Sequence, residues 1–281
     1  YGKINSVLGT TIDKKDVIDV FRRLGFGVED RKSYATVSVP KRRIDIAIKE
    51  DLIEEAGRIY GVNNIEGKLP TLPVKPGSYD VTTRQIRNKM VTLGLNETLS
   101  YVLVNDKEAK EFTKDDKEAI SLLDPMTEER NTLRNSVATS LYKIYEFNKA
   151  HFNKDVSIFE IGKSFYKKGE EYGEEKKLAA LMTGTFSLGI GNEKQVDFYV
   201  IKGVAEELLD YLGYRGRYSF VVNDLIPSSF HPGKAAAISV NNDVVGFIGR
   251  VHPTKCKDEV YVMEINLSKL LDKKVGKMKY K

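Results

Sequence analysis

Apolar residues in the first sixty positions recur twice at helical spacing, with a β-prone stretch between the two runs. The first run follows the i, i+3, i+4, i+7 rule of an amphipathic helix and comprises Val17, Val20, Phe21 and Leu24. Asp13 can cap this helix and Gly25 can end it. β-prone residues then lead to a break at Pro40, and a second helix is predicted over residues 51–60, closed by Gly61. The pattern predicts a small mixed domain.

The rest of the chain is predicted to hold few helices and many strands. Helical spacing predicts one helix that ends at Gly94 and two more over residues 133–150 and 198–212. Residues 98–104 are predicted to form a strand, as are six further apolar runs at 156–161, 178–183, 218–222, 235–240, 244–251 and 260–265. Asn241-Asn242-Asp243 separates two of these runs and predicts a hairpin of antiparallel strands. We therefore expect an α+β fold, in which a small mixed domain precedes a domain with a largely antiparallel sheet flanked by helices.

A proline-rich segment separates the two patterns. Three of the eight prolines fall within residues 69–77, where neither a helix nor a central strand can persist. A length of 281 residues also favours two domains over one or four. We predict one domain over residues 1–72 and a second over residues 73–281, joined by this linker.

Composition excludes several classes of protein. With 41% hydrophobic and 30% charged residues, the chain falls in the globular range rather than the disordered or fibrous ones. No apolar run is long enough to span a membrane and no signal-peptide layout opens the chain, so we expect a cytoplasmic protein. Cys256 is the only cysteine, which excludes an intrachain disulfide and a four-cysteine zinc site. Tyr1 in place of a methionine suggests a piece of a longer protein.

Few segments have the residues of a catalytic, metal-binding or nucleic-acid-binding site. No segment matches a phosphate-binding loop, and His151, His231 and His252 lack the partners that a metal site or a catalytic triad needs. The net charge of +5 only weakly favours an anionic partner. Two basic clusters, residues 41–43 and the lysine-rich tail 273–281, could contact RNA phosphates, but such runs are more often solubility features or linkers.

Four acidic residues are predicted to gather on one side of the second helix. At about 100° per residue, Asp51, Glu54 and Glu55 fall on one arc, away from the apolar face. Asp45 precedes the helix by six residues, close enough for a turn to bring its carboxylate to the same side. Converging carboxylates suit a hard cation such as Mg²⁺. The alternative is that Asp51 only caps the helix, while the other acidic groups are solvated or favour the helix dipole.

The segment around these residues resembles a known family. Residues 39–61 read Val-Pro-Lys-Arg-Arg-Ile-Asp-Ile-Ala-Ile-Lys-Glu-Asp-Leu-Ile-Glu-Glu-Ala-Gly-Arg-Ile-Tyr-Gly, and they resemble the B5 domain of the bacterial phenylalanyl-tRNA synthetase beta chain. Further segments resemble the catalytic-like B6 and B7 region of that family; they are Thr83-Arg-Gln-Ile-Arg, Gly94-Leu-Asn-Glu-Thr, Leu123-Asp-Pro-Met, Leu133-Arg-Asn-Ser, Ile158-Phe-Glu-Ile-Gly162, Asp197-Phe-Tyr, Lys202-Gly, Phe230-His-Pro-Gly233 and Gly249-Arg-Val-His-Pro253. The resemblance covers essentially the whole chain. The family's editing region would precede Tyr1 and its anticodon-binding domain would follow Lys281.

The resemblance implies a metal site shared with a partner. The positions that match the family's Mg²⁺ ligands, shared with its alpha chain, are Asp45, Asp51, Glu54 and Glu55. Arg58 lies on the same arc and could compete by pairing with a carboxylate.

The resemblance also implies that the bond-making groups lie elsewhere. Class II synthetases hold ATP with arginines, one of them on a glycine-rich segment, and this chain offers only Arg250, which Val-His-Pro follows. We therefore expect no catalytic or cofactor-binding residues here, and ATP bound by the alpha chain. The implied function is a non-catalytic fragment that supports attachment of phenylalanine to its tRNA by the alpha chain, in an (alpha-beta)2 heterotetramer with tRNA as the other partner. The alternative function is a nucleic-acid-binding module acting through the small N-terminal domain.

Overall fold

The computed structural model describes residues 1–69, 71, 73, 77, 80–114, 117–187, 189 and 191–272. The chain divides into two compact units, unit 1 at Tyr1–Ser78 and unit 2 at Tyr79–Lys281, and each is described by itself. Most of the predicted linker and the whole lysine-rich tail lie outside the described residues. No helix in the described part of the chain is long and apolar enough to cross a membrane.

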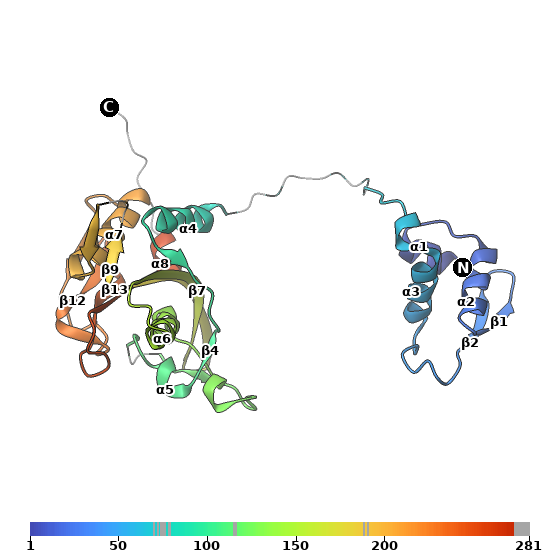
Figure 1. Cartoon of the computed structure of the whole chain (residues 1–281), viewed down its shortest axis with the longest axis horizontal. Coiled ribbons are helices and arrows are strands. Elements are labelled where there is room, and N and C mark those ends of the chain that lie inside the picture. The colour runs from blue at the N-terminus through green and yellow to red at the C-terminus, as the bar shows by residue number, and fades with distance from the viewer. Residues whose placement is uncertain are drawn as a thin grey trace. The chain divides into compact units, whose positions relative to one another are not determined.

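Unit 1 is a small mixed fold in which helices pack beside a two-stranded ribbon (Figure 1). Its elements are α1 (Gly2–Leu8), α2 (Lys14–Arg23), β1 (Gly27–Asp30), β2 (Ala35–Ser38), α3 (Lys49–Tyr60) and the 3-10 turn η1 (Val62–Asn64). The apolar face predicted for α2 is buried: Val17, Val20 and Phe21 pack against Phe26 and Ala56. The helix predicted at 51–60 is confirmed as α3, which begins two residues earlier, at Lys49.

Unit 2 holds the remaining elements, which follow in chain order. They are α4 (Thr82–Thr92), β3 (Asn96–Glu97), β4 (Leu103–Val104), α5 (Asp106–Ala109), β5 (Ile120–Ser121), η2 (Glu128–Arg130), β6 (Thr132–Leu133), α6 (Val137–Ala150), β7 (Val156–Lys168), β8 (Glu171–Thr183), β9 (Thr185–Ser187), β10 (Glu193–Gln195), α7 (Phe198–Tyr211), β11 (Tyr218–Val221), β12 (Phe230–Val240), β13 (Asp243–Val251), β14 (Val260–Asn266) and α8 (Leu267–Leu271).

A seven-stranded sheet forms the centre of unit 2. Its strand order is β11-β12-β13-β14-β8-β7-β3, and every neighbouring pair is antiparallel except β3 with β7. The hairpin predicted at Asn241-Asn242-Asp243 joins β12 to β13. Asn241 and Asn242 both have positive φ, 51° and 69°, as a two-residue hairpin turn requires. The α+β prediction, with a largely antiparallel sheet, is confirmed.

Helices cover both faces of this sheet (Figure 1). Because side chains alternate along a strand, Leu178, Ala180 and Met182 of β8 face α4, α7 and α8, whereas Ala179 and Leu181 face α6. The same alternation on β14 leaves both faces apolar, so the sheet is a buried layer between two cores. The cores fix the position of the α6 N-terminus over the sheet.

Several predicted boundaries in unit 2 are wrong. The strands predicted at 156–161, 178–183 and 235–240 are longer in the structure, where they form β7, β8 and β12. Residues 98–104 do not form one strand: β3 pairs with β7 in the large sheet, β4 pairs with β6 in a small three-stranded sheet, and the chain between them crosses from one to the other. The helix predicted from residue 133 begins at Val137, because Thr132 and Leu133 are held between β4 and β5. Ser136 then caps the helix by accepting a hydrogen bond from the Ala138 N–H.

Candidate functional site

Asp51 lies in the first turn of α3 and is engaged by the backbone. Its Oδ2 accepts hydrogen bonds from the N–H of Ala47 at 2.8 Å and of Ile48 at 2.9 Å. These two bonds hold the pKa of Asp51 below its usual value, although the nearby charge of Asp45 opposes that shift. Asp51 therefore has a capping role, as one of the two interpretations predicts. It acts from the third residue of the helix rather than as the N-cap, because α3 begins at Lys49 and its N-cap is Ile48.

Arg43 pairs with two of the other predicted ligands. Its Nε lies 2.9 Å from Asp45 Oδ1 and its Nη2 lies 2.6 Å from Asp45 Oδ2, which is a bidentate contact. The same Nη2 lies 3.1 Å from Glu55 Oε1. Arg43 thus joins the loop before α3 to the helix itself, and its hydrogen bonds to Asp45 lower the pKa of that carboxyl group.

Arg58 provides a second guanidinium for Glu55. Its Nη2 donates to Glu55 Oε2 at 2.6 Å, and this contact, ahead of that from Arg43, lowers the pKa of Glu55. Arg58 therefore pairs with one of the predicted metal ligands, as expected from the sequence. Glu54 is exposed on the neighbouring turn of α3.

These residues do not form a ready Mg²⁺ site. Among the residues that the structure describes, no three His, Cys, Asp or Glu side chains form a group that could hold a metal ion. Both oxygens of Asp45 and of Glu55 contact guanidinium groups, and one oxygen of Asp51 accepts from the backbone. As arranged, the four predicted ligands lie on one side of α3 but do not converge, and they fit a metal poorly.

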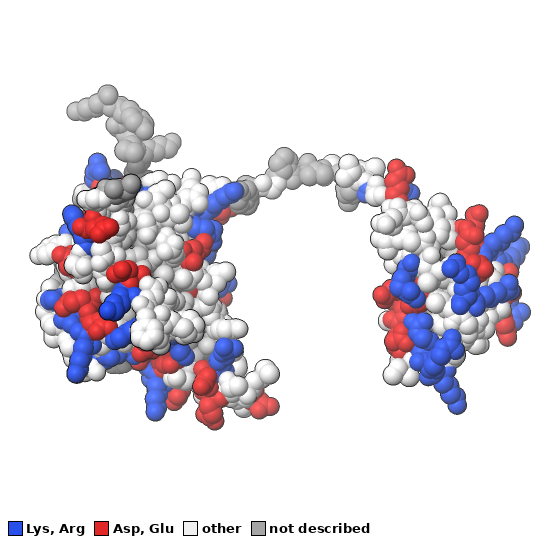
Figure 2. All heavy atoms as spheres, viewed as in Figure 1, with Lys and Arg blue, Asp and Glu red and all other residues white. Residues whose placement is uncertain are grey.

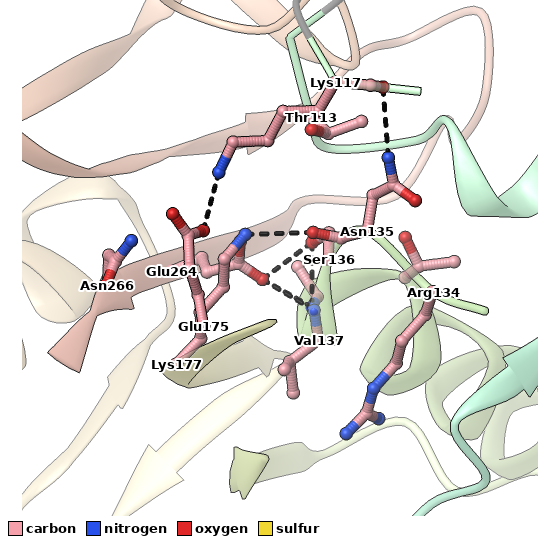
Figure 3. Close-up of polar contacts among 12 residues, drawn as sticks. Thr113, Lys117, Arg134, Asn135, Ser136, Val137, Glu175, Lys177, Glu264 and Asn266 are labelled. Carbon is pink, nitrogen blue, oxygen red and sulfur yellow. Dashed lines mark hydrogen bonds and ion pairs between the residues drawn. The ribbon is translucent and has the colours of Figure 1, made fainter. Parts of the chain in front are cut away.

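The sheet face beneath α6 carries a second group of polar residues (Figure 3). Glu264 of β14 points at the N-terminus of α6, where its Oε2 accepts from Ser136 Oγ and from the N–H of Val137 at 2.7 Å each. Its Oε1 lies 2.8 Å from Lys177 Nζ on β8. A helix N-terminus favours an anion because its first N–H groups lack partners. Here Glu264 itself fills that position.

A cavity of about 260 Å³ lies beside this pair. Lys117 and Glu175 pair across it at 2.7 Å, and Phe112, Phe247 and Asn266 contribute to its walls. Among the described residues that line it there is no arginine. Arg250, the one candidate left by the sequence, lies on β13 and pairs with Glu259 at 3.0 Å.

Sequence reasoning missed a buried ion pair on the same face. Arg134 Nη2 lies 2.7 Å from Glu160 Oε1, and the two side chains are 1% and 3% exposed. Arg134 also donates to Ser100 Oγ, Ser140 Oγ and the carbonyl oxygen of Lys163. Gly162 leaves room for it, because a Cβ there would collide with Nη2. The sequence did carry a signal for such a group. Glu160 is a single charged residue within an apolar strand, and so is Glu264, and a charge in that position is buried only when it is paired.

Comparison with known proteins accounts for both units. Residues 65–267 match the family model described as the phenylalanyl tRNA synthetase beta chain CLM domain, and residues 1–62 match the tRNA synthetase B5 domain. The phenylalanine–tRNA ligase beta subunit of Bacillus subtilis (strain 168) is 37% identical over 289 residues, and that of Staphylococcus aureus is 38% identical over 291. Each alignment covers 99% of this chain and 36% of the relative, so the chain spans about a third of the length of these proteins.

A solved structure shares the fold. A pyrrolysyl tRNA synthetase from Desulfitobacterium hafniense superposes with a TM-score of 0.50 at 16% identity, covering 67% of this chain and 65% of that one. At this identity the likeness shows the fold alone, which is that of a class II synthetase. The family models and the relatives go further, and together they show that the chain belongs to the phenylalanyl-tRNA synthetase beta chain family.

Proposed function

We propose that this chain is a non-catalytic part of a phenylalanine–tRNA ligase beta subunit, which supports ATP-dependent attachment of phenylalanine to its tRNA by the alpha chain. The observation that carries the proposal is the face beneath α6. Lys177 and the α6 N-terminus, which could bind an anionic substrate, are both engaged by Glu264. Stabilising the charge that develops during adenylation needs cations that are free to act. The synthetase fold here serves as a scaffold.

The partner in this proposal is the alpha chain, in an (alpha-beta)2 heterotetramer that also binds tRNA, acts in the cytoplasm and holds ATP on the alpha chain. Helices α4 and α7 expose apolar side chains that a partner could cover: Val91, Tyr199 and Tyr211 are each at least half exposed. Exposed apolar groups of this kind mark interaction surfaces when they gather together. These helices are therefore the docking elements that we propose for the alpha chain.

The test combines an activity with an association. The purified chain should show no phenylalanine-dependent exchange of pyrophosphate into ATP, and it should co-purify with the alpha chain as a complex of defined mass. Exchange by the isolated chain, at a rate above that of a buffer blank, would contradict the non-catalytic role. Failure to associate with the alpha chain would contradict the scaffold role.

The assignment of Mg²⁺ to Asp45, Asp51, Glu54 and Glu55 stays a prediction. Asp51→Asn tests it, because Asn can still accept the two backbone hydrogen bonds while the charged ligand is lost. The fold should be retained, and association with the alpha chain should depend less on Mg²⁺ than it does for the wild-type chain. Identical association across a magnesium titration would leave Asp51 with its capping role only.

The alternative, a nucleic-acid-binding module in unit 1, has less support. Basic and acidic side chains alternate over the face of unit 1 seen in Figure 2. Of the basic cluster at 41–43, Arg43 is paired with Asp45 and Glu55, and Arg42 donates to the carbonyl oxygen of Leu24. Binding of tRNA by the isolated chain that weakens steeply as salt rises would favour this alternative.

A further inference from the structure

We propose that the cavity beside Lys117 and Glu175 in unit 2 binds a small phosphate monoester, and that Lys114 and Lys269 are the cations that hold its phosphate group. The volume of the cavity is about 260 Å³, whereas pockets for drug-sized ligands usually measure about 300–1,000 Å³. The cavity therefore suits a smaller molecule. Binding at this cavity adds to the scaffold role and does not depend on it.

The described residues that line the cavity carry more positive than negative charge. The lysines among them are Lys114, Lys117, Lys177 and Lys269. Lys117 pairs with Glu175 at 2.7 Å. Lys177 pairs with Glu264 at 2.8 Å (Figure 3). Since these glutamates are the acidic residues in the same described lining, four lysines and two glutamates leave a net charge of +2.

Backbone carbonyls orient the two remaining lysines. Lys269 Nζ donates to the carbonyl oxygen of Val244 at 2.6 Å, and Lys114 Nζ donates to that of Asp224. Within the described part of the chain, neither ammonium forms an ion pair with a carboxylate. A carbonyl oxygen accepts a hydrogen bond without neutralising the charge, and an ammonium group has three donors. Lys114 and Lys269 therefore keep their charge and further N–H donors for an anion.

The segment that carries Lys114 is fixed by Phe112. The φ of Phe112 is 54°, which is uncommon for a residue other than glycine. The Phe112 ring lies 5.6 Å from that of Phe230, and its N–H donates to Ser229 Oγ at 3.0 Å. These contacts hold a strained backbone that places Thr113 and Lys114 on the cavity wall. A wall that is already ordered lowers the entropy cost of binding.

The charge and the walls of the cavity together indicate the class of ligand. A phosphate monoester carries a charge of about −1.5 to −2 at pH 7 and offers three acceptor oxygens, which matches two free ammonium groups. A single carboxylate would match only half of that charge. Leu225, Val245 and Phe247 give the cavity an apolar side that can cover the organic part of the ester.

The test measures binding of phenyl phosphate by the whole 281-residue chain, with isothermal titration calorimetry. Lys114→Met and Lys269→Met should each weaken binding by about tenfold or more, because a charge-assisted hydrogen bond is lost while an apolar side chain is kept. Neither lysine is buried, so both variants should fold. Lys154→Met is the matched control, because Lys154 is exposed in the same unit and does not line the cavity. That control should bind phenyl phosphate as the wild-type chain does.

A change in the opposite direction is expected of Glu175→Gln. This variant releases Lys117 from its ion pair and should bind phenyl phosphate more tightly than the wild-type chain. Inorganic phosphate should bind more weakly than phenyl phosphate, since it has no group for the apolar side of the cavity. Equal affinity for the two compounds would overturn the assignment to a monoester.

Two results would overturn the site itself. One is equal affinity of the wild-type chain, Lys114→Met and Lys269→Met for phenyl phosphate, and the other is no binding by the wild-type chain at millimolar concentration. Because pyrophosphate exchange and association with the alpha chain are measured separately, either result would leave the scaffold function standing.

Discussion

The stability of unit 2 depends on the pairing of one buried carboxylate, that of Glu160, with Arg134. The Glu160 carboxylate is buried against Arg134 at 2.7 Å and also accepts a hydrogen bond from Ser100 Oγ. Glu160→Gln should lower the free energy of unfolding of unit 2 by about 3–5 kcal/mol, because the Arg134 guanidinium would stay buried without a counter-charge. Urea denaturation followed by circular dichroism measures this loss.

The neighbouring strands offer a matched control for that change. Lys163 and Glu174 form an ion pair across the same β7–β8 hairpin, but both side chains are more than half exposed. Glu174→Gln should therefore change the unfolding free energy by less than about 1 kcal/mol. Similar losses for the two variants would contradict the view that burial, rather than pairing, sets the cost.

The carboxylates of unit 1 predict how its stability changes with pH. The pKa values of Asp45, Asp51 and Glu55 all lie below the ordinary values of 3.8 for Asp and 4.5 for Glu. A lowered pKa means that the unfolded state binds more protons, so the stabilisation is complete above the ordinary pKa and is lost as the pH falls through the folded one. The stability difference between the wild-type chain and Glu55→Gln should shrink between about pH 6 and pH 3. Denaturation at several pH values measures it, and a constant difference would contradict the assignment of the shift to Arg58 and Arg43.

At the residue scale, the sequence located the acidic residues around the start of α3 and one of their partners, Arg58, but it did not identify Arg43 as the other. Helical spacing placed Asp51, Glu54 and Glu55 on one side of α3, because spacing depends only on the 3.6-residue period. It could not show that Arg43 reaches Glu55, since that contact joins residues twelve positions apart across a loop. The orientation of Arg43 depends on Phe26, which the chain brings close only when unit 1 has folded.

At the element scale, two glycines with different surroundings test what a Cβ costs. Gly246 lies in β13 between two strands, and a Cβ there would collide with the carbonyl oxygen of Glu264. Gly203 lies in α7, where a Cβ would have no atom of the described residues within 4 Å, apart from its own helix backbone and chain neighbours. Gly246→Ala should destabilise unit 2 by about 3 kcal/mol, because backbone must move. Gly203→Ala should stabilise it by about 0.5–1 kcal/mol, since Ala is the better helix former. Thermal or urea denaturation distinguishes the two, and an equal effect would contradict the close approach at Gly246.

Long elements were located correctly, although β7 and β8 each extend seven residues beyond the predicted strands, and short elements were predicted poorly. The strands from β7 to β14 that form the large sheet carry apolar runs on a buried layer, so local composition alone marks them. The two-residue strands β3, β4 and β6 exist because of their partners, and nothing in residues 98–104 indicates that the chain changes sheets there. Helix α1 was not predicted, and it has no fully buried residue of its own. Tertiary pairing, rather than local preference, determines these elements.

At the scale of the whole molecule, each unit has a core of its own. The core of unit 1 is drawn from residues up to Tyr60, and both cores of unit 2 begin beyond residue 85. Phe21→Ala removes a ring that is 2% exposed and stacked 6.2 Å from Phe26, which should cost unit 1 about 3–5 kcal/mol. Deuterium uptake, measured by mass spectrometry, should rise across α2 and α3 and stay unchanged across the large sheet.

The same variant separates the contributions of the two units to assembly. If the alpha chain docks on α4 and α7, the Phe21→Ala chain should still co-purify with it, because those helices pack on a core that the substitution does not touch. Tyr199→Ala is the counterpart: it shortens a side chain that is 76% exposed on α7, so it should weaken association while both units stay folded. The opposite result, with association lost in Phe21→Ala and kept in Tyr199→Ala, would move the docking surface to unit 1.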